Sequence, residues 1–207
     1  MLPEAASTNA VVAARARAGE DPGLVVVTDH QTAGRGRLDR AWVTPARSAL
    51  TFSALLTPDR VDTARWPWLP LLTGIAVAEA VRRVAGVDCG LKWPNDVLVG
   101  EQKLAGILVE RVERPAGPVA VVGVGLNVSQ TEAELPVPTA TSLAMAGATT
   151  TDRTVVLREV LRTLEALYVQ WQADAGDPAQ GLHPSYLRRC STLGCTVRVD
   201  LPTGEQV

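Results

Sequence analysis

The alternation of apolar and polar positions along the chain predicts a mixture of helices and strands. Residues 24–29, LVVVTD, form a β-branched run that is typical of a buried strand, and residues 49–56 predict a second strand. Cap-type residues followed by alanines at helical spacing predict a first helix over residues 7–19, which ends at a glycine. A largely apolar helix is expected over residues 69–86, and a three-then-four apolar spacing predicts an amphipathic helix over residues 152–172.

The middle of the chain predicts a meander. The segments GLKWP, DVLV, KLAGILVERV and VAVVGVGLNV lie between residues 90 and 128 and are joined by connections as short as GEQ. Such short connections favour antiparallel neighbours, so the expected fold class is α+β, with a mixed, largely antiparallel sheet flanked by helices. Near the end, CTVRVDLPTGEQV alternates like a hairpin around residues 202–204 and predicts the beginning of a small, incomplete β domain.

Composition limits the classes of function. With 207 residues, 46% of them hydrophobic, the chain can bury one full core, so one main domain is expected. The 20 basic residues are balanced by 22 acidic ones, which disfavours bulk attraction to nucleic acid or membranes and favours a small anionic ligand held at one place.

Three cysteines without a paired or metal-binding spacing fit reduced thiols in the cytoplasm. The N-terminus has no basic segment followed by an apolar run, so no signal peptide is predicted. Prolines and Glu79 interrupt the most apolar stretch, residues 66–81, so no membrane span is predicted.

Residues 30–42, HQTAGRGRLDRAW, place glycines and arginines directly after a predicted strand. Glycines let backbone N–H groups approach an anion closely, and Arg35 and Arg37 add planar, permanently charged donors suited to phosphate or carboxylate. The alternative is a solvated surface turn. Because the stretch holds little apolar surface, residues 33–41 are expected to be mobile until a ligand orders them.

Lysines, amides and a carboxylate recur at the ends of the meander strands. KWPND contains Lys92, Asn95 and Asp96, Lys103 introduces the run LAGILVE, and GVGLN ends at Asn127. Lys92 and Lys103 are candidates for neutralising a reacting phosphate, and Asp96 for binding magnesium or accepting a proton from an amine. A lysine beside a buried strand must direct its ammonium group to an anion or to solvent. The alternatives are a surface lysine and ordinary turn residues.

These segments resemble those of biotin protein ligases. STN at residues 7–9, QTAGRGRxxxxW ending at Trp42, KWPND, KLAGILVE and GVGLN occur in the order found in that family. The resemblance covers nearly the whole chain. It implies the biotin/lipoate ligase catalytic fold, which is similar to that of class II aminoacyl-tRNA synthetases, over residues 1–189, and the beginning of an SH3-like β domain over residues 190–207.

The activity implied by the resemblance has two steps. The biotin carboxylate attacks the α-phosphate of ATP to give biotinyl-5′-AMP and pyrophosphate, and a lysine of a biotin carboxyl carrier protein, from acetyl-CoA carboxylase or a related carboxylase, then takes the biotinyl group. ATP, Mg²⁺ and biotin are the implied small molecules. Bringing a carboxylate to a triphosphate requires cations, because each charge pair at about 4 Å is worth ~4 kcal/mol near a protein surface.

The resemblance also implies roles for individual residues. Catalysis is expected of Lys103, Arg37 and Asp96, and Asp96 is the candidate magnesium ligand. The implied biotin-binding residues are Ser7, Thr8, Asn9, Gln31, Arg35, Gly36, Arg37 and Lys103. The implied ATP and adenylate contacts are Arg35, Arg37, Trp42, Lys92, Asn95 and Asn127. On the residues alone, Ser7 or Thr8 capping the first helix and Trp42 packing in the core remain alternatives.

Two other functions compete with this interpretation. A lipoate ligase shares the fold and the adenylate chemistry, but lipoate is apolar where biotin carries its ureido ring, so the polar residues at 7–9 and 31 would lack partners. A non-catalytic biotin or nucleotide sensor is the alternative from another class. Ala6 stands where these ligases often have glycine. Because little sequence precedes Ser7, neither a DNA-binding helix-turn-helix nor a DNA partner is expected. The protein is also predicted to be a monomer or weak homodimer.

Overall fold

Six strands form one sheet in the computed structural model, which describes residues 1–197. Their spatial order is β1-β4-β8-β7-β6-β5, and all neighbours are antiparallel, so β5 to β8 form the predicted meander. The strands are β1 (Val25–Thr28), β4 (Ala49–Leu56), β5 (Gly90–Lys92), β6 (Asp96–Val99), β7 (Gln102–Val112) and β8 (Val119–Asn127).

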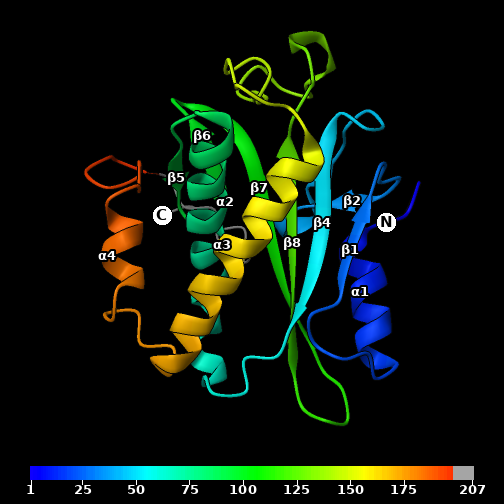
Figure 1. The fold of residues 1–207 in the computed structure, drawn as a ribbon, viewed down its shortest axis with the longest axis vertical. Helices are drawn as coiled ribbons and strands as arrows, with labels where there is room; N and C mark the ends of the chain where they lie inside the picture. Colours follow the sequence, from blue (N-terminus) through cyan, green and yellow to red (C-terminus); the bar gives the residue numbers. More distant parts are fainter. Residues whose placement is uncertain (198–207) are drawn as a thin grey trace.

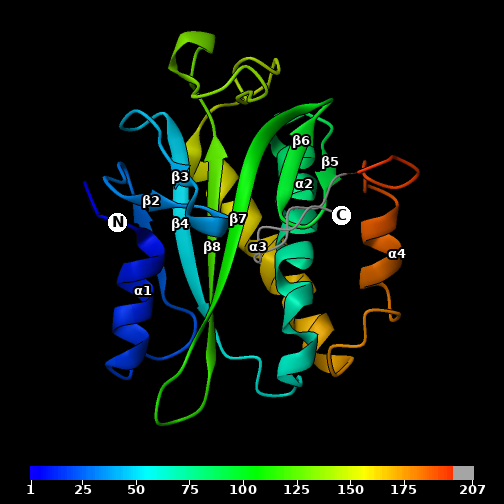
Figure 2. The same ribbon diagram turned by 180° about the vertical axis from the view of Figure 1, so that it is seen from behind.

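The sheet lies between two unequal layers (Figures 1 and 2). The long helices α2 (Leu69–Ala85) and α3 (Arg153–Ala173) cover one face and pack against each other. Helix α1 (Thr8–Arg17) and a small hairpin of β2 (Gly34–Arg35) and β3 (Ala41–Trp42) cover the other face. The remaining elements are the short helix α4 (Leu182–Leu187) and the 3-10 turns η1 (Arg37–Asp39), η2 (Thr63–Trp68) and η3 (Glu132–Glu134).

β8 is buried along its whole length because both layers cover it. Successive side chains of a strand point to opposite faces. Val124 packs into the apolar cluster that includes α2, whereas Val121 packs with Val12 of α1 on the other face. Further along that second face the strand carries Gly123 and Gly125 before Asn127 at its end, so the sheet surface beyond the end of α1 has room for a cavity.

The predicted helices and strands are confirmed, with ends shifted by a few residues. Sequence reasoning missed the β2–β3 hairpin, the 3-10 turns and α4, all of which are too short to show a clear period. η2 and α4 also contain Pro67 and Pro184, which usually signal a break in a helical pattern. The predicted hairpin around residues 202–204 lies outside the described residues. Within residues 1–197, no helix combines the length and apolar character needed to cross a membrane.

Partial burial protects one of the cysteines. Desolvation of the Cys89 thiol, together with the nearby Asp88 carboxylate, raises its pKa to about 12. Because the thiolate is the reactive form, Cys89 is expected to react slowly at pH 8. We expect an alkylating reagent at pH 8 to modify the exposed Cys195 and to spare Cys89 until the protein is denatured, as mapped by mass spectrometry. Equal labelling of the two thiols in the folded protein would contradict this expectation.

Candidate functional site

A cavity of about 540 Å³ lies over the bare glycine surface of the sheet, on the side of α1 and the β2–β3 hairpin. Its volume is typical of sites for small molecules. Every residue that the sequence singled out lines it: Ser7, Thr8, Asn9, Gln31, Arg35, Gly36, Arg37, Trp42, Lys92, Asn95, Asp96, Lys103 and Asn127. Residues more than a hundred positions apart in the chain are therefore brought to one place.

One wall of the cavity offers hydrogen-bond donors. Gln31 Oε1 accepts from the backbone N–H of Thr8 at 2.8 Å and from Thr8 Oγ1 at 3.2 Å, which leaves the Nε2 group of Gln31 without a partner among residues 1–197. Ser7 occupies the N-cap position of α1, yet its side chain makes no capping hydrogen bond. The capping alternative is therefore wrong for the Ser7 side chain, and the Gln31 amide and Ser7 hydroxyl are free to meet a ligand.

Asn9 holds this wall together. Its Nδ2 group donates to Leu108 O at 3.3 Å and to Glu110 Oε2 at 2.7 Å, and its Oδ1 accepts from Ser53 Oγ at 2.6 Å. Both amide hydrogens are thus used within the protein, and Asn9 fastens α1 to β7 and β4. Sequence reasoning missed Ser53 and Glu110, although a serine inside the buried run ALTFSALL was an available signal.

Cations also line the cavity. Lys103 Nζ lies 2.7 Å from Asp96 Oδ1, which confirms that the lysine directs its ammonium group to an anion. A register shift between Val97 and Leu98 in β6 accompanies the pairing of this strand with Lys103. The main chain of Lys103 is fixed by Thr139 O, at 2.7 Å from its N–H. Arg35, Arg37 and Lys92 add exposed positive charge around the same cavity.

Glycines form the floor of the cavity and seat Trp42. Gly106 and Gly125 are directly opposite each other in β7 and β8. A Cβ at Gly125 would lie 2.5 Å from Trp42 Cε2, and one at Gly123 would lie 2.1 Å from Asn9 Oδ1. Trp42 therefore packs against the floor with one part of its ring, and its buried Nε1 has no hydrogen-bond partner in the described chain. The three glycines were missed, although glycine within a strand often marks such a close approach.

The two asparagines at the strand ends are engaged to different degrees. Asn127 Nδ2 donates to Thr141 O at 2.9 Å, and its Oδ1 accepts from Gln130 Nε2 at 3.0 Å. Asn95 Nδ2 donates to Ile107 O at 2.9 Å, which leaves its Oδ1 available. Asn127 therefore shapes the cavity wall, whereas Asn95 retains an acceptor for a ligand or a hydrated cation.

Two of the arginines in the glycine–arginine loop, residues 33–41, differ in their contacts. Arg35 Nη2 lies 3.6 Å from Glu110 Oε1, whereas Arg37 makes no ion pair within residues 1–197. Gly36 N–H donates to Arg40 O at 2.6 Å, and Leu38 adopts a left-handed φ of 53° with its side chain 49% exposed. The loop thus has local hydrogen bonds but little apolar packing, and its mobility without ligand stays a prediction.

The chain matches the Biotin/lipoate A/B protein ligase family over residues 4–127. It is 42% identical over 211 aligned residues to the biotin–[acetyl-CoA-carboxylase] ligase of Mycobacterium tuberculosis, covering all of this chain and 76% of that protein. It is 33% identical to the bifunctional ligase/repressor BirA of Bacillus subtilis, over 79% of this chain and about half, 51%, of that protein. The solved structure of the Aquifex aeolicus biotin protein ligase with biotin and ATP superposes with a TM-score of 0.82 at 30% identity, covering all of this chain and 83% of that one.

The fold, the cavity and the similarity to known ligases together define the chain as an enzyme of the ligase class. The family match covers more than half of the chain, and the mycobacterial relative matches its full length. The chain belongs to the Biotin/lipoate A/B protein ligase family.

Proposed function

We propose that the chain is an ATP-dependent biotin protein ligase, which activates biotin as biotinyl-5′-AMP and transfers the biotinyl group to a lysine of a biotin carboxyl carrier protein. One observation carries the proposal: a single cavity combines open hydrogen-bonding groups at Ser7 and Gln31 with the cations Lys103 and Arg37. Biotin has the matching groups, a ureido ring that both donates and accepts hydrogen bonds and a carboxylate. The biotin and ATP in the Aquifex aeolicus complex agree with this assignment.

In the first step a carboxylate oxygen of biotin attacks the α-phosphorus of ATP, and the bond from that phosphorus to the bridging oxygen of pyrophosphate breaks. Lys103 is placed to neutralise the carboxylate and then the acyl phosphate, since its ammonium group has three donors and Asp96 uses only part of them. Arg37, which has no internal ion pair in the described chain, supplies a second cation. Such fixed charges stabilise the transition state because they need no reorganisation.

In the second step the carrier amine attacks the acyl carbon, the bond to AMP breaks, and the amine loses a proton. Asp96 is the carboxylate that lines the cavity beside Lys103, so we assign the proton to it. The loop of Arg35, Gly36 and Arg37 would keep water away from the mixed anhydride between the two steps.

The residues of this site could hold magnesium only together with the phosphates of the bound nucleotide. No group of three or more metal-ligating side chains is present within residues 1–197, but Mg²⁺ is commonly held by one carboxylate and substrate phosphates. Asp96, with the free Oδ1 of Asn95, would provide the protein side of such a site. The ion would supply neutralisation of the phosphate charge.

The choice between biotin and lipoate is open to a direct test. We expect biotin, but not lipoate, to bind in a calorimetric titration and to drive pyrophosphate release from ATP, since the Ser7 and Gln31 groups need a polar ligand. A preference for lipoate would replace the proposed substrate. Binding of biotin without pyrophosphate release would indicate a sensor instead.

Replacing Gly125 by alanine is expected to raise the KM for ATP about tenfold, because the new methyl group displaces the Trp42 ring and stacking on a base is worth ~1–3 kcal/mol. Steady-state kinetics would measure the change. Gly90→Ala is the matched control, since a Cβ there meets nothing closer than 3.6 Å. If the two variants have the same KM for ATP, Trp42 does not contact the adenine.

A further inference from the structure

The segment that covers the cavity has two stems at one end of the sheet. Residues 29–48 connect β1 to β4 and carry Gln31 as well as the glycine–arginine loop. The first stem begins at Asp29, whose backbone carbonyl accepts from the N–H of Arg47 on the second stem at 2.8 Å. The side chains of the same two residues form an ion pair, with Arg47 Nε 3.4 Å from Asp29 Oδ2.

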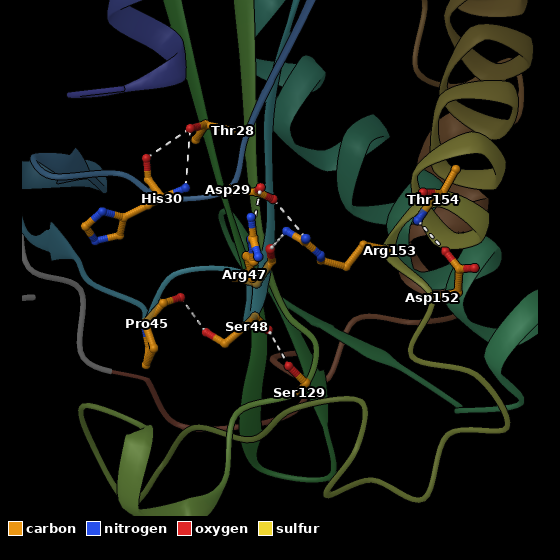
Figure 3. Close-up of polar contacts among 11 residues, drawn as sticks. Thr28, Asp29, His30, Pro45, Arg47, Ser48, Ser129, Asp152, Arg153 and Thr154 are labelled. Atoms are coloured by element: carbon orange, nitrogen blue, oxygen red, sulfur yellow. Dashed lines mark hydrogen bonds and ion pairs between the residues drawn. The ribbon is translucent and has the colours of Figure 1, made fainter. Parts of the chain in front are cut away.

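A residue from the opposite layer reaches the first stem and the start of β4, where the second stem ends. Arg153, the first residue of α3, places Nη2 2.8 Å from Asp29 Oδ1, and its Nη1 donates to Ala49 O at 3.3 Å. Figure 3 shows Arg153 extending from α3 toward Asp29, with Arg47 on the other side of the carboxylate. One guanidinium group therefore connects the helix layer to the first stem and to the start of β4.

The energetics of this contact differ from those of a surface ion pair. The Asp29 side chain is only 13% exposed and its Oδ1 is shielded from solvent, so the carboxylate depends on its cations. A positive side chain in the first turn of a helix opposes the helix dipole. An arginine at position 153 therefore does not stabilise the helix itself. Its planar guanidinium instead suits the two acceptors, Asp29 Oδ1 and Ala49 O, which lie in different directions.

We propose that Asp29 and Arg153 are positioning residues, forming a clasp that fixes the stems of residues 29–48 and thereby holds Gln31 and the loop arginines over the cavity. The inference deepens the proposed function and rests on it, because the task of the held loop is to retain biotin and the acyl-adenylate. The clasp itself touches neither the substrate nor the reacting atoms.

Limited digestion with trypsin tests the clasp without any need for activity, because the loop contains three cleavage sites, at Arg35, Arg37 and Arg40. With saturating biotin, which is expected to order the loop, we expect Arg153→Gln to accelerate cleavage at these sites about tenfold, with no change at the other sites that the two proteins share. Arg158→Gln, the same substitution at an exposed position of α3, is the matched control and should cleave like the wild type. Equal loop cleavage in the two variants overturns the clasp, as does acceleration spread over the whole chain.

Asp29→Asn provides a second variant, which keeps the shape and an acceptor oxygen while removing the charge. It should also accelerate cleavage in the loop, and Arg153→Lys should restore only part of the protection because an ammonium group cannot reproduce the two-directional contact. Failure of Asp29→Asn to accelerate cleavage would likewise overturn the clasp.

Kinetics separate positioning from a purely structural role. Well below the melting temperature, Arg153→Gln should raise the KM for biotin and the off-rate of biotinyl-5′-AMP about tenfold, while kcat for pyrophosphate release changes less than threefold. An unchanged KM and off-rate would leave only a structural role and overturn the inference. If the wild type releases no pyrophosphate, the proposed function fails, and the digestion pattern still decides whether the clasp exists.

Discussion

Replacing Lys103 by glutamine is expected to slow pyrophosphate release, at saturating biotin and ATP, by about two to three orders of magnitude. The ammonium group lies in the cavity 2.7 Å from Asp96, and its main chain is fixed by a hydrogen bond to Thr139. The charge is therefore held in place before substrate arrives. Glutamine keeps a donor of similar length but removes the charge that a carboxylate and an α-phosphate both need.

A companion variant separates chemistry from folding. Loss of Lys103 leaves the shielded Oδ1 of Asp96 without its cation, which lowers the free energy of unfolding. Adding Asp96→Asn to Lys103→Gln should restore thermal stability but not the rate. Near-normal pyrophosphate release by Lys103→Gln, with biotin binding intact in a calorimetric titration, would remove the lysine from the mechanism.

The strands and long helices were predictable because their signals are local. β8 is buried on both faces, so its sequence is one apolar run. α3 buries Val156, Val160 and Leu164 along one face, so its apolar residues recur with the period of a helix. The lysines and the carboxylate of the candidate site could be located for a related reason, since they recur at the ends of neighbouring apolar strands. The residues at 7–9 and 31 were indicated only by the resemblance to biotin protein ligases.

Their individual tasks could not be predicted, because they depend on partners far away in the chain. Asn9 and Gln31 were both expected to face biotin, yet Asn9 donates both amide hydrogens to β7, which is about a hundred residues away, and only Gln31 keeps a free donor. Arg153 gave no sequence signal at all, since an arginine on an amphipathic helix is normally a solvated residue. Contacts of this kind are decided by tertiary packing rather than by any local pattern.

Replacing Arg37 by glycine is expected to increase the off-rate of biotinyl-5′-AMP by about ten- to a hundredfold, with a smaller effect on biotin itself. A hydrogen bond to a charged group is worth ~1.5–3 kcal/mol, and biotin lacks the phosphate that Arg37 would hold. Unlike Arg35, which lies 3.6 Å from Glu110, Arg37 has no ion pair in the described chain, so its removal breaks no salt bridge within the fold.

The leaking intermediate should be visible chemically as well as kinetically. A released acyl-adenylate reacts with any nearby amine, so Arg37→Gly should biotinylate lysines of an added bystander protein, whereas the wild type should label only the carrier. Arg37→Lys keeps the charge and should restore most of the retention, which distinguishes loss of charge from loss of loop structure. Stopped-flow measurement of the off-rate and blotting of the bystander would be made on all three proteins. Wild-type retention by Arg37→Gly, or equal labelling by the glycine and lysine variants, would show that Arg37 does not hold the adenylate.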